Sequence, residues 1–218
     1  MGAIQHDLFQ TEPVLPAGIS LMRGRIDLED GRALLDDMLG VFAAAPPYRL
    51  RMKTGAYVIN QMTNCGSLGW HSDERGYRYV DRHPETGTPW PPIPPRLKAL
   101  AMQAAAACAA PFVPDACLVN LYAEEGKLNL HQDHDEKDFA WPIVSFSFGN
   151  DAIFALGGAR RRDPVQPVTL RHGDVMVMHG ESRMRFHGVK KIVPGTAPFD
   201  HPAIPAGGRL NLTFRRAA

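Results

Sequence analysis

Several features that would place a chain in a membrane, in the secretory pathway or in a disulfide-bonded scaffold are missing from this sequence. No apolar run reaches the roughly 18–20 residues that a membrane-spanning helix needs. The N-terminal segment contains Asp7 and Glu12 and lacks the basic and apolar regions of a secretory signal. Cys65, Cys108 and Cys117 have no C-x-x-C spacing, which favours buried packing roles in a reducing compartment. We therefore expect a cytoplasmic protein that does not contact a membrane.

A strong net charge is also missing, since the formal charge is +1 over 218 residues. No global field then draws the protein to a polyanion, and any binding of nucleic acid has to come from local patches. No repeat, linker or low-complexity tail divides the chain, and its length suffices for one large domain with its own core. We expect a single domain over residues 1–218.

The pattern of apolar residues predicts two helices followed mainly by short strands. Residues 28–42 have helical spacing, and residues 94–110 are rich in alanine, with Pro95 suited to a first turn and Pro111 as a stop. The expected strands are 57–59, 116–122, 143–148, 152–156, 167–170, 174–178, 184–189 and 209–215. This order predicts an α+β, mostly β fold, a double-stranded β-helix (jelly roll) core over about residues 115–216 with N-terminal helices.

Residues 66–95 show little regular patterning and contain several aromatic side chains, among them Trp70, Tyr77, Tyr79 and Trp90. A long irregular stretch in a compact domain is usually functional or disordered, and its aromatic content argues against disorder. We expect a substrate lid here, within a flank of about residues 50–95.

Residues 128–136 concentrate side chains that bind metal ions. In an extended strand His131 and Asp133 point the same way. One imidazole and one carboxylate are two-thirds of the 2-His-1-carboxylate triad of non-haem Fe(II) oxygenases. The other interpretation is a solvated strand end without metal. The candidates for a third ligand are His172, His179, His187 and His201, among which spacing favours His187 only weakly.

Residues 209–215 alternate between apolar and polar side chains. The polar face, which carries Arg209, Asn211, Thr213 and Arg215, is either a wet outer surface or the lining of a pocket. In a pocket, the two guanidinium groups would bind the carboxylates of a dicarboxylic ligand. Asn120 and Tyr122 share a face of another strand and could donate further hydrogen bonds. An iron triad with such a clamp indicates 2-oxoglutarate.

Ordered blocks along the chain carry a resemblance to a known family. They are Met62-Thr63-Asn64-Cys65-Gly66-x-Leu68-Gly69-Trp70, Asn120-Leu121-Tyr122, Leu128-x-Leu130-His131-Gln132-Asp133-x-Asp135-Glu136, Pro142-Ile143-Val144-Ser145, His172-Gly173-Asp174-Val175, Gly180-Glu181-Ser182-Arg183, His187-Gly188 and Arg209-x-Asn211-Leu212-Thr213-Phe214-Arg215. These blocks resemble the bacterial AlkB-type dioxygenases, which repair alkylated nucleobases. The resemblance runs from about Leu8 to Arg216 and selects His187 as the third ligand.

The resemblance implies a set of cofactors and the residues that hold them. His131, Asp133 and His187 would bind Fe(II) and leave positions for the cosubstrates 2-oxoglutarate and O₂. Arg215, assisted by Tyr122, would bind the distal carboxylate of 2-oxoglutarate. The carboxylate end near the iron would be held by Arg209, Asn120 and Asn211.

The resemblance also implies roles at the substrate, with residues 66–95 as a nucleotide-recognition lid. Trp70 would stack on the flipped base and sandwich it against His131, and Tyr77 would hold the substrate backbone. The remaining substrate residues would be Asp135 and Glu136 at the exocyclic nitrogen, Met62 in the base pocket and Arg161 near the nucleic acid.

The implied activity is oxidative demethylation of 1-methyladenine and 3-methylcytosine in DNA, preferably single-stranded, with RNA as a further substrate. Formaldehyde, succinate and CO₂ would be released by a monomer without an obligate protein partner. The alternatives are a 2-oxoglutarate-dependent hydroxylase of a protein or small molecule, and a nucleic-acid-binding module without turnover. Two departures from the family, the acidic lid residues Asp73 and Glu74 and the imidazole of His134, bear on strand preference.

Overall fold

The computed structural model describes residues 13–51 and 54–218. The expected domain begins at residue 1 and the resemblance at about Leu8, so both starting points lie outside the described residues. The strands are β1 (Ile19–Met22), β2 (Tyr48–Arg51), β3 (Tyr57–Gly66), β4 (Gly69–Asp73), β5 (Gly76–Val80), β6 (Ala116–Tyr122), β7 (Leu128–His131), β8 (Ile143–Gly149), β9 (Asp151–Leu156), β10 (Gln166–Leu170), β11 (Val175–Met178), β12 (His187–Val193) and β13 (Arg209–Arg215). The helices are α1 (Leu28–Ala44), α2 (Pro95–Ala107) and the 3-10 turn η1 (Gly180–Ser182).

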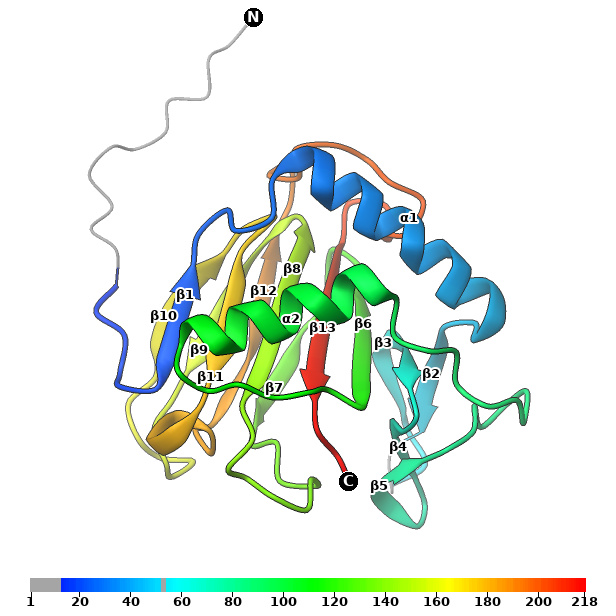
Figure 1. The fold of residues 1–218 in the computed structure, drawn as a ribbon, viewed down its shortest axis with the longest axis horizontal. Helices are drawn as coiled ribbons and strands as arrows, with labels where there is room; N and C mark the ends of the chain where they lie inside the picture. Colours follow the sequence, from blue (N-terminus) through cyan, green and yellow to red (C-terminus); the bar gives the residue numbers. More distant parts are fainter. Residues whose placement is uncertain (1–12, 52–53) are drawn as a thin grey trace, which may run out of the picture.

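The strands form two facing sheets and a separate hairpin (Figure 1). The larger sheet has the order β1-β11-β8-β13-β6-β3-β2, and the smaller has the order β10-β9-β12-β7. β4 and β5 pair only with each other. This arrangement confirms the expected mostly β fold with a jelly-roll core and a helical flank.

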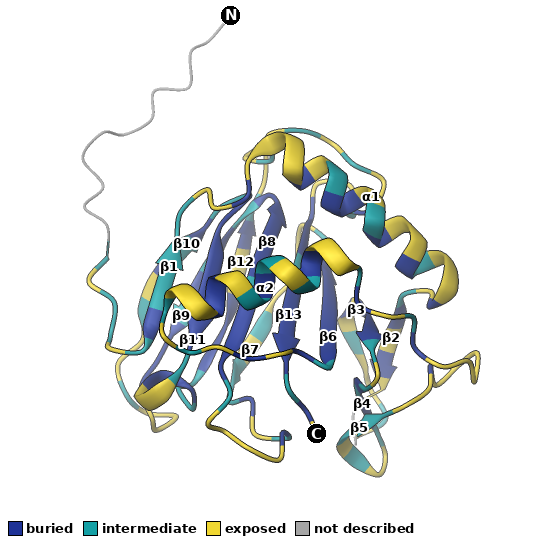
Figure 2. Cartoon of the chain, in the orientation of Figure 1, coloured by how far each residue is buried: buried dark blue, intermediate teal, exposed yellow. Residues whose placement is uncertain are grey.

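Both helices cover the outer face of the larger sheet (Figure 2). The Asp27 side chain caps α1 by accepting a hydrogen bond from the Asp30 amide at 2.8 Å. Leu34, Leu35 and Met38 on its inner face are buried against the sheet. Within residues 13–51 and 54–218, no helix is long and apolar enough to cross a membrane.

The alternation of apolar and polar residues in β13 shows which face of the larger sheet packs against the helices. Leu210, Leu212 and Phe214 are fully buried in the core beneath the helices. The polar side chains of β13 therefore point into the space between the two sheets, and the interpretation as a wet outer face is wrong. Because β13 pairs with β6 in a register that sets Arg209 opposite Tyr122, the polar residues of both strands line the same interior.

Several strands differ from those expected from the sequence. β3 runs to Gly66, whereas the sequence predicted an end at residue 59. The second half of the strand was missed because polar and apolar residues are buried there alike, which leaves no alternating pattern. β12 begins at His187 rather than at residue 184, because η1 and the turn after it occupy residues 180–186. β1 and β2 were not predicted; each has four residues, too few for a periodic signal.

The expected lid contains the hairpin of β4 and β5. Its turn consists of Glu74 and Arg75, because Asp73 pairs with Gly76. The sequence lacks the Asn-Gly or Asp-Gly pair that usually marks such a turn, so the hairpin was not predicted. Arg78 donates to both carboxylate oxygens of Asp73 at 2.6 Å and ties the two strands together.

Candidate functional site

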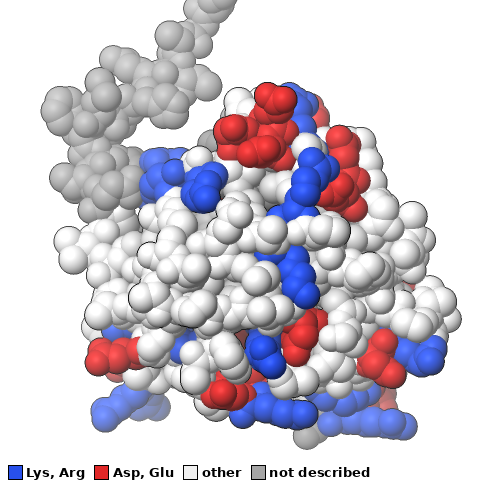
Figure 3. Space-filling model, in the orientation of Figure 1, with Lys and Arg blue, Asp and Glu red and all other residues white. Residues whose placement is uncertain are grey.

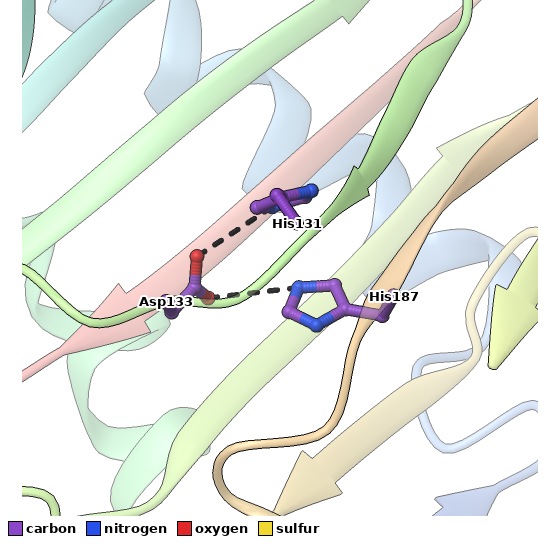
Figure 4. Close-up of side chains that lie close together, drawn as sticks. All are labelled: His131, Asp133 and His187. Carbon is purple, nitrogen blue, oxygen red and sulfur yellow. Dashed lines mark ion pairs between the residues drawn. The ribbon is translucent and has the colours of Figure 1, made fainter. Parts of the chain in front are cut away.

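Three side chains from β7, the loop after it and β12 converge between the sheets (Figure 4). His131 Nε2 lies 3.6 Å from Asp133 Oδ1, and His187 Nε2 lies 3.7 Å from Asp133 Oδ2. One ligand atom from each of the three residues falls within 4.8 Å of the others. The structure therefore brings together the His131, Asp133 and His187 set expected from the sequence.

The outer nitrogen of each imidazole is occupied by the backbone. His131 Nδ1 lies 2.9 Å from the Asn129 carbonyl oxygen, and His187 Nδ1 lies 3.0 Å from the Arg185 carbonyl oxygen. A carbonyl can only accept, so each Nδ1 carries the proton and each Nε2 keeps a lone pair that faces Asp133. Two such lone pairs and a carboxylate fit Fe(II) by their chemistry.

Electrostatics keep these groups in the states in which they bind metal ions. Burial alone would raise the pKa of Asp133, but the Arg215 guanidinium and the neighbouring imidazoles hold it below its usual range. Burial lowers the pKa of His187 to about 4, so this imidazole is neutral at pH 7. No proton has to leave either group before a cation binds at neutral pH.

The metal-free protein should become less stable as the pH falls from 6.5 to about 4. In the unfolded chain His187 binds a proton near pH 6.5, whereas in the folded protein it stays neutral until about pH 4, so acid favours unfolding. Linkage gives a loss of about 2 kcal/mol from this group between pH 7 and pH 5. Urea unfolding at both pH values should show a loss larger by about that amount in wild-type protein than in His187→Ala. Equal losses would contradict a buried neutral imidazole.

A glycine next to His187 lets the two ligand-bearing strands approach. A Cβ on Gly188 would lie 2.4 Å from the Leu128 carbonyl oxygen, so a side chain there would push β12 away from β7. The close approach sets His187 opposite His131 in the register of the two strands.

The other three candidate histidines lie elsewhere in the fold. His172 packs edge-on against Phe148 in the core beneath the helices. His179 precedes η1, and His201 contacts Asp36 at 3.2 Å. None of them belongs to the metal-binding cluster found among the described residues.

The two arginines of β13 occupy opposite ends of an inner cavity that begins at the triad. Arg215 Nη2 donates to Asp133 Oδ2 at 2.8 Å, so Arg215 stands at the metal end. Arg209 is six residues away on the same strand, about 20 Å along it. This contact favours the reverse of the expected allocation, in which Arg215 bound the distal carboxylate of 2-oxoglutarate and Arg209 the carboxylate near the iron.

Arg209 is a buried cation whose hydrogen bonds all go to neutral groups. Its two Nη atoms donate to Ser147 Oγ and to the carbonyl oxygens of Asn150 and Leu170, and its Nε has no partner in the described chain. Arg209 forms no ion pair with any described carboxylate, and burial lowers its pKa to about 10. The far end of the cavity is therefore suited to a carboxylate supplied by a ligand.

Three further expected cosubstrate residues line the same cavity. Asn120 is buried on β6, and burial raises the pKa of the neighbouring Tyr122 to about 12. Asn211 donates to Ser145 Oγ at 2.7 Å and to the Phe146 carbonyl at 2.9 Å. These bonds fix the Asn211 amide before any ligand arrives.

A second, open groove of about 710 Å³ lies above the triad. Five of the six expected substrate residues line it, namely Met62, Trp70, Tyr77, Asp135 and Arg161. His131, Asp133 and Arg215 line both this groove and the inner cavity. The two spaces therefore meet at the candidate metal site.

Trp70 is fixed in the groove by residues of the block that precedes it. Asn64 Oδ1 accepts from the Trp70 amide at 3.0 Å, and Asn64 Nδ2 donates to the Trp70 carbonyl at 3.1 Å. A Cβ on Gly69 would lie 2.5 Å from the Trp90 ring, so this turn needs glycine. Asn64 and Gly69 in the sequence block 62–70 therefore both serve to place the Trp70 indole.

The Trp70 side chain is held from two sides. Its Nε1 donates to Asp135 Oδ2 at 2.7 Å, and its ring stacks on Tyr77 with centroids 5.4 Å apart. The indole bond uses Oδ2 of Asp135 and not Oδ1, and it holds the carboxylate at the groove wall.

Glu136 does not line the groove, contrary to expectation. Its buried carboxylate accepts from Tyr79 Oη at 2.6 Å and from Arg183 Nη2 at 3.0 Å, and it lies 3.2 Å from Arg215 Nε. The expected contact of Glu136 with a base is therefore wrong, whereas Asp135 lines the groove. No role was predicted for Tyr79 or Arg183, because an alternating pattern does not mark the partners of a buried carboxylate.

The acidic residues of the lid are paired with arginines. Arg78 binds Asp73, and Arg51 Nη1 lies 2.9 Å from Glu74 Oε1. Each of the two acidic lid residues that bear on strand preference therefore has a cationic partner. Figure 3 shows basic and acidic side chains side by side along the lower edge of this face, and Figure 1 places the hairpin at the right end of that edge.

Comparisons with known proteins agree with this geometry. Residues 18–215 match the 2OG-Fe(II) oxygenase superfamily. The protein named alpha-ketoglutarate-dependent dioxygenase AlkB homolog from Caulobacter vibrioides is 45% identical over 201 residues, which cover 92% of this chain and 88% of that protein. The Arabidopsis thaliana protein named DNA N(6)-methyladenine demethylase ALKBH1D is 50% identical over 108 residues, covering 47% of this chain and 24% of that protein. The solved structure of OsALKBH1 is 31% identical with a TM-score of 0.82, covering 94% of this chain and 99% of that one.

Proposed function

This chain belongs to the AlkB family of Fe(II)- and 2-oxoglutarate-dependent dioxygenases, and we propose that it removes N-methyl groups from alkylated nucleobases. The proposed substrates are 1-methyladenine and 3-methylcytosine in DNA, with RNA as a further substrate. The products are the restored base, formaldehyde, succinate and CO₂. His131, Asp133 and His187 are the proposed iron ligands.

The junction of the two cavities carries this proposal. A dicarboxylate in the inner cavity and a base in the outer groove would reach the triad from different sides, because His131, Asp133 and Arg215 line both spaces. A base can therefore bind without displacing the cosubstrate. When bound, Fe(II) with 2-oxoglutarate and O₂ supplies the oxidising chemistry that acts on the methyl carbon.

The lining of the inner cavity supports one orientation of 2-oxoglutarate. We assign its distal carboxylate to Arg209, assisted by Tyr122, because Arg209 is the buried cation without a carboxylate partner. Arg215 is assigned to the metal end because it donates to Asp133. Asn120 and Asn211 would then contact the cosubstrate between these ends.

The outer groove suits a positively charged base. Methylation at the proposed positions gives the base a formal positive charge, which the Asp135 carboxylate and the indole face of Trp70 attract. The Trp70 Nε1 bond holds Asp135 at the groove wall and keeps the indole from rotating. Met62 would pack against the base, and His131 would form the wall opposite Trp70.

A single strand is the proposed preferred form of the substrate. A base in a duplex has to be flipped at a cost of a few kcal/mol, which a single strand avoids. Arg161, whose guanidinium lies over the Phe186 ring, and Lys127 line the groove and would contact phosphates together with Tyr77. One chain supplies every residue of this site, which supports a monomer that needs no protein partner.

The proposal is tested by formaldehyde release from a single-stranded oligonucleotide that contains one 1-methyladenine. With Fe(II), 2-oxoglutarate, ascorbate and air, we expect one formaldehyde per restored adenine and none from the unmodified oligonucleotide. The corresponding duplex should react more slowly. No formaldehyde under these conditions would contradict the proposed substrate.

Succinate formation separates demethylation from the alternative activity. If methylated DNA is the substrate, its addition should raise succinate formation together with formaldehyde. Succinate formed at a rate that methylated nucleic acid does not change would instead favour a hydroxylase of a protein or small molecule.

A further inference from the structure

The base-binding hairpin is bonded at two adjacent points to the loop that carries a candidate metal ligand. Trp70 and Tyr79 lie directly opposite each other on β4 and β5. Trp70 Nε1 donates to Asp135 at 2.7 Å, and Tyr79 Oη donates to Glu136 at 2.6 Å. Asp135 and Glu136 follow Asp133 by two and three residues. The hairpin therefore cannot leave the loop without breaking bonds within three residues of Asp133.

Glu136 is connected to Asp133 through two arginines. Arg215 lies 3.2 Å from Glu136 through its Nε and donates to Asp133 Oδ2 through Nη2 at 2.8 Å. Arg183 donates to Glu136 Oε2 at 3.0 Å and to the Asp133 carbonyl oxygen at 2.8 Å. One arginine thus holds the side chain of Asp133 and the other holds its backbone.

The cluster is buried and balanced in charge, which gives it one preferred arrangement. The side chains of Glu136 and Arg183 are each 2% exposed, and those of Asp133 and Arg215 are 8% and 7% exposed. Two guanidinium groups face two carboxylates, so a shift of Glu136 would leave charge uncompensated where water cannot screen it. Tyr79 is the hairpin residue that bonds to this cluster, and burial raises the pKa of its hydroxyl, which stays protonated as a donor.

We propose that Glu136 is a positioning residue that couples docking of the β4–β5 hairpin to the orientation of the Asp133 carboxylate. With the hairpin docked, Tyr79 holds Glu136, Glu136 holds Arg215, and Arg215 orients Asp133 toward both imidazoles. Docking then strengthens metal binding at the triad. Because coupling between two sites is reciprocal, a bound metal ion also slows opening of the hairpin. The inference rests on the triad as the metal site and does not require a particular substrate.

The test uses Co(II) as a redox-stable metal probe, titrated into the full-length protein without nucleic acid. Tyr79→Phe removes one hydroxyl and keeps the ring, and should weaken Co(II) binding about 5- to 150-fold, the usual range for coupling between sites. Tyr77→Phe is the matched control, because it removes a hydroxyl from the same strand at a residue that is 55% exposed. Its Co(II) affinity should equal that of the wild-type protein.

Hydrogen exchange of residues 69–80 gives a second readout that a merely structural role would not change. Co(II) should slow exchange of the hairpin amides in wild-type protein and in Tyr77→Phe, but much less in Tyr79→Phe. Glu136→Gln should show the same loss of coupling with a larger fall in affinity. If this variant does not fold, Tyr79→Phe decides the matter.

Wild-type Co(II) affinity in Tyr79→Phe together with undiminished slowing of exchange would overturn the proposal. Wild-type protein that binds no Co(II) would overturn it as well, along with the assignment of the triad. Weakened Co(II) binding in a protein that releases no formaldehyde would leave the coupling in place and reject only the proposed substrate.

Discussion

Replacing Arg209 with methionine should weaken 2-oxoglutarate binding by roughly 30-fold to several thousand-fold. Removing one partner of a buried, hydrogen-bonded charge pair costs about 2–5 kcal/mol, and each 1.4 kcal/mol corresponds to tenfold in affinity. Arg209 is 1% exposed and its guanidinium has no described carboxylate partner, so the ligand would supply its counter-charge. Isothermal titration of 2-oxoglutarate into the Mn(II)-loaded protein measures the effect.

Two control variants separate a loss of ligand binding from a loss of stability. Arg96→Met removes an exposed guanidinium that pairs with Asp37 on α1 and should leave the affinity for 2-oxoglutarate unchanged. Arg215→Met removes the partner of two buried carboxylates and should destabilise the ligand-free protein by about 3–5 kcal/mol. Arg209→Met should lower the melting temperature much less than Arg215→Met does, because Arg209 forms no ion pair with a described carboxylate. A fall as large as that of Arg215→Met would identify Arg209 as a structural residue.

His187→Ala should abolish demethylation and weaken Co(II) binding by more than about 100-fold. Loss of a partner that only orients a metal ligand already costs about 10- to 100-fold in metal affinity, so loss of a ligand atom should cost more. His187 contributes Nε2 to a set of three ligand atoms, and its Nδ1 is bonded to a backbone carbonyl. Cobalt absorption and formaldehyde release measure the two effects.

The other candidate histidines provide matched controls for this prediction. His179→Ala and His201→Ala remove the same side chain from positions outside the triad, and both variants should bind Co(II) with wild-type affinity. A variant of His187 that keeps metal-dependent turnover would contradict its role as a ligand.

The strand that carries the proposed cosubstrate clamp could be predicted to the residue, but its surroundings could not. Perfect alternation gave the bounds Arg209–Arg215 because one face of this strand is wholly apolar. Whether the polar face met water or a cavity depended on the second sheet, which no local pattern reveals. The sequence also did not show which arginine lies near the candidate metal site. Arg209 and Arg215 are on the same face at opposite ends of the strand, and only the folded structure shows that the Arg215 end contacts Asp133.

Errors at the substrate side came from long-range partners. Glu136 is adjacent to Asp135, and the two were expected to act together on the base. The structure separates them, because Tyr79, Arg183 and Arg215, each more than forty residues away in sequence, bind the Glu136 carboxylate. The third ligand had the same difficulty: spacing left four histidines open, and only the resemblance selected His187.

The position of β13 in the larger sheet has a consequence for how the protein is synthesised. β13 lies between β6 and β8, yet it leaves the ribosome after both of them and after every metal ligand. Until then the edges of β6 and β8 that will flank it have no partner strand between them, and both arginines of the clamp are absent. A nascent chain can thus contain all three candidate iron ligands before it has either of the arginines proposed to bind 2-oxoglutarate. The proposed cosubstrate site is therefore complete only when the last strand of the chain enters the centre of the larger sheet.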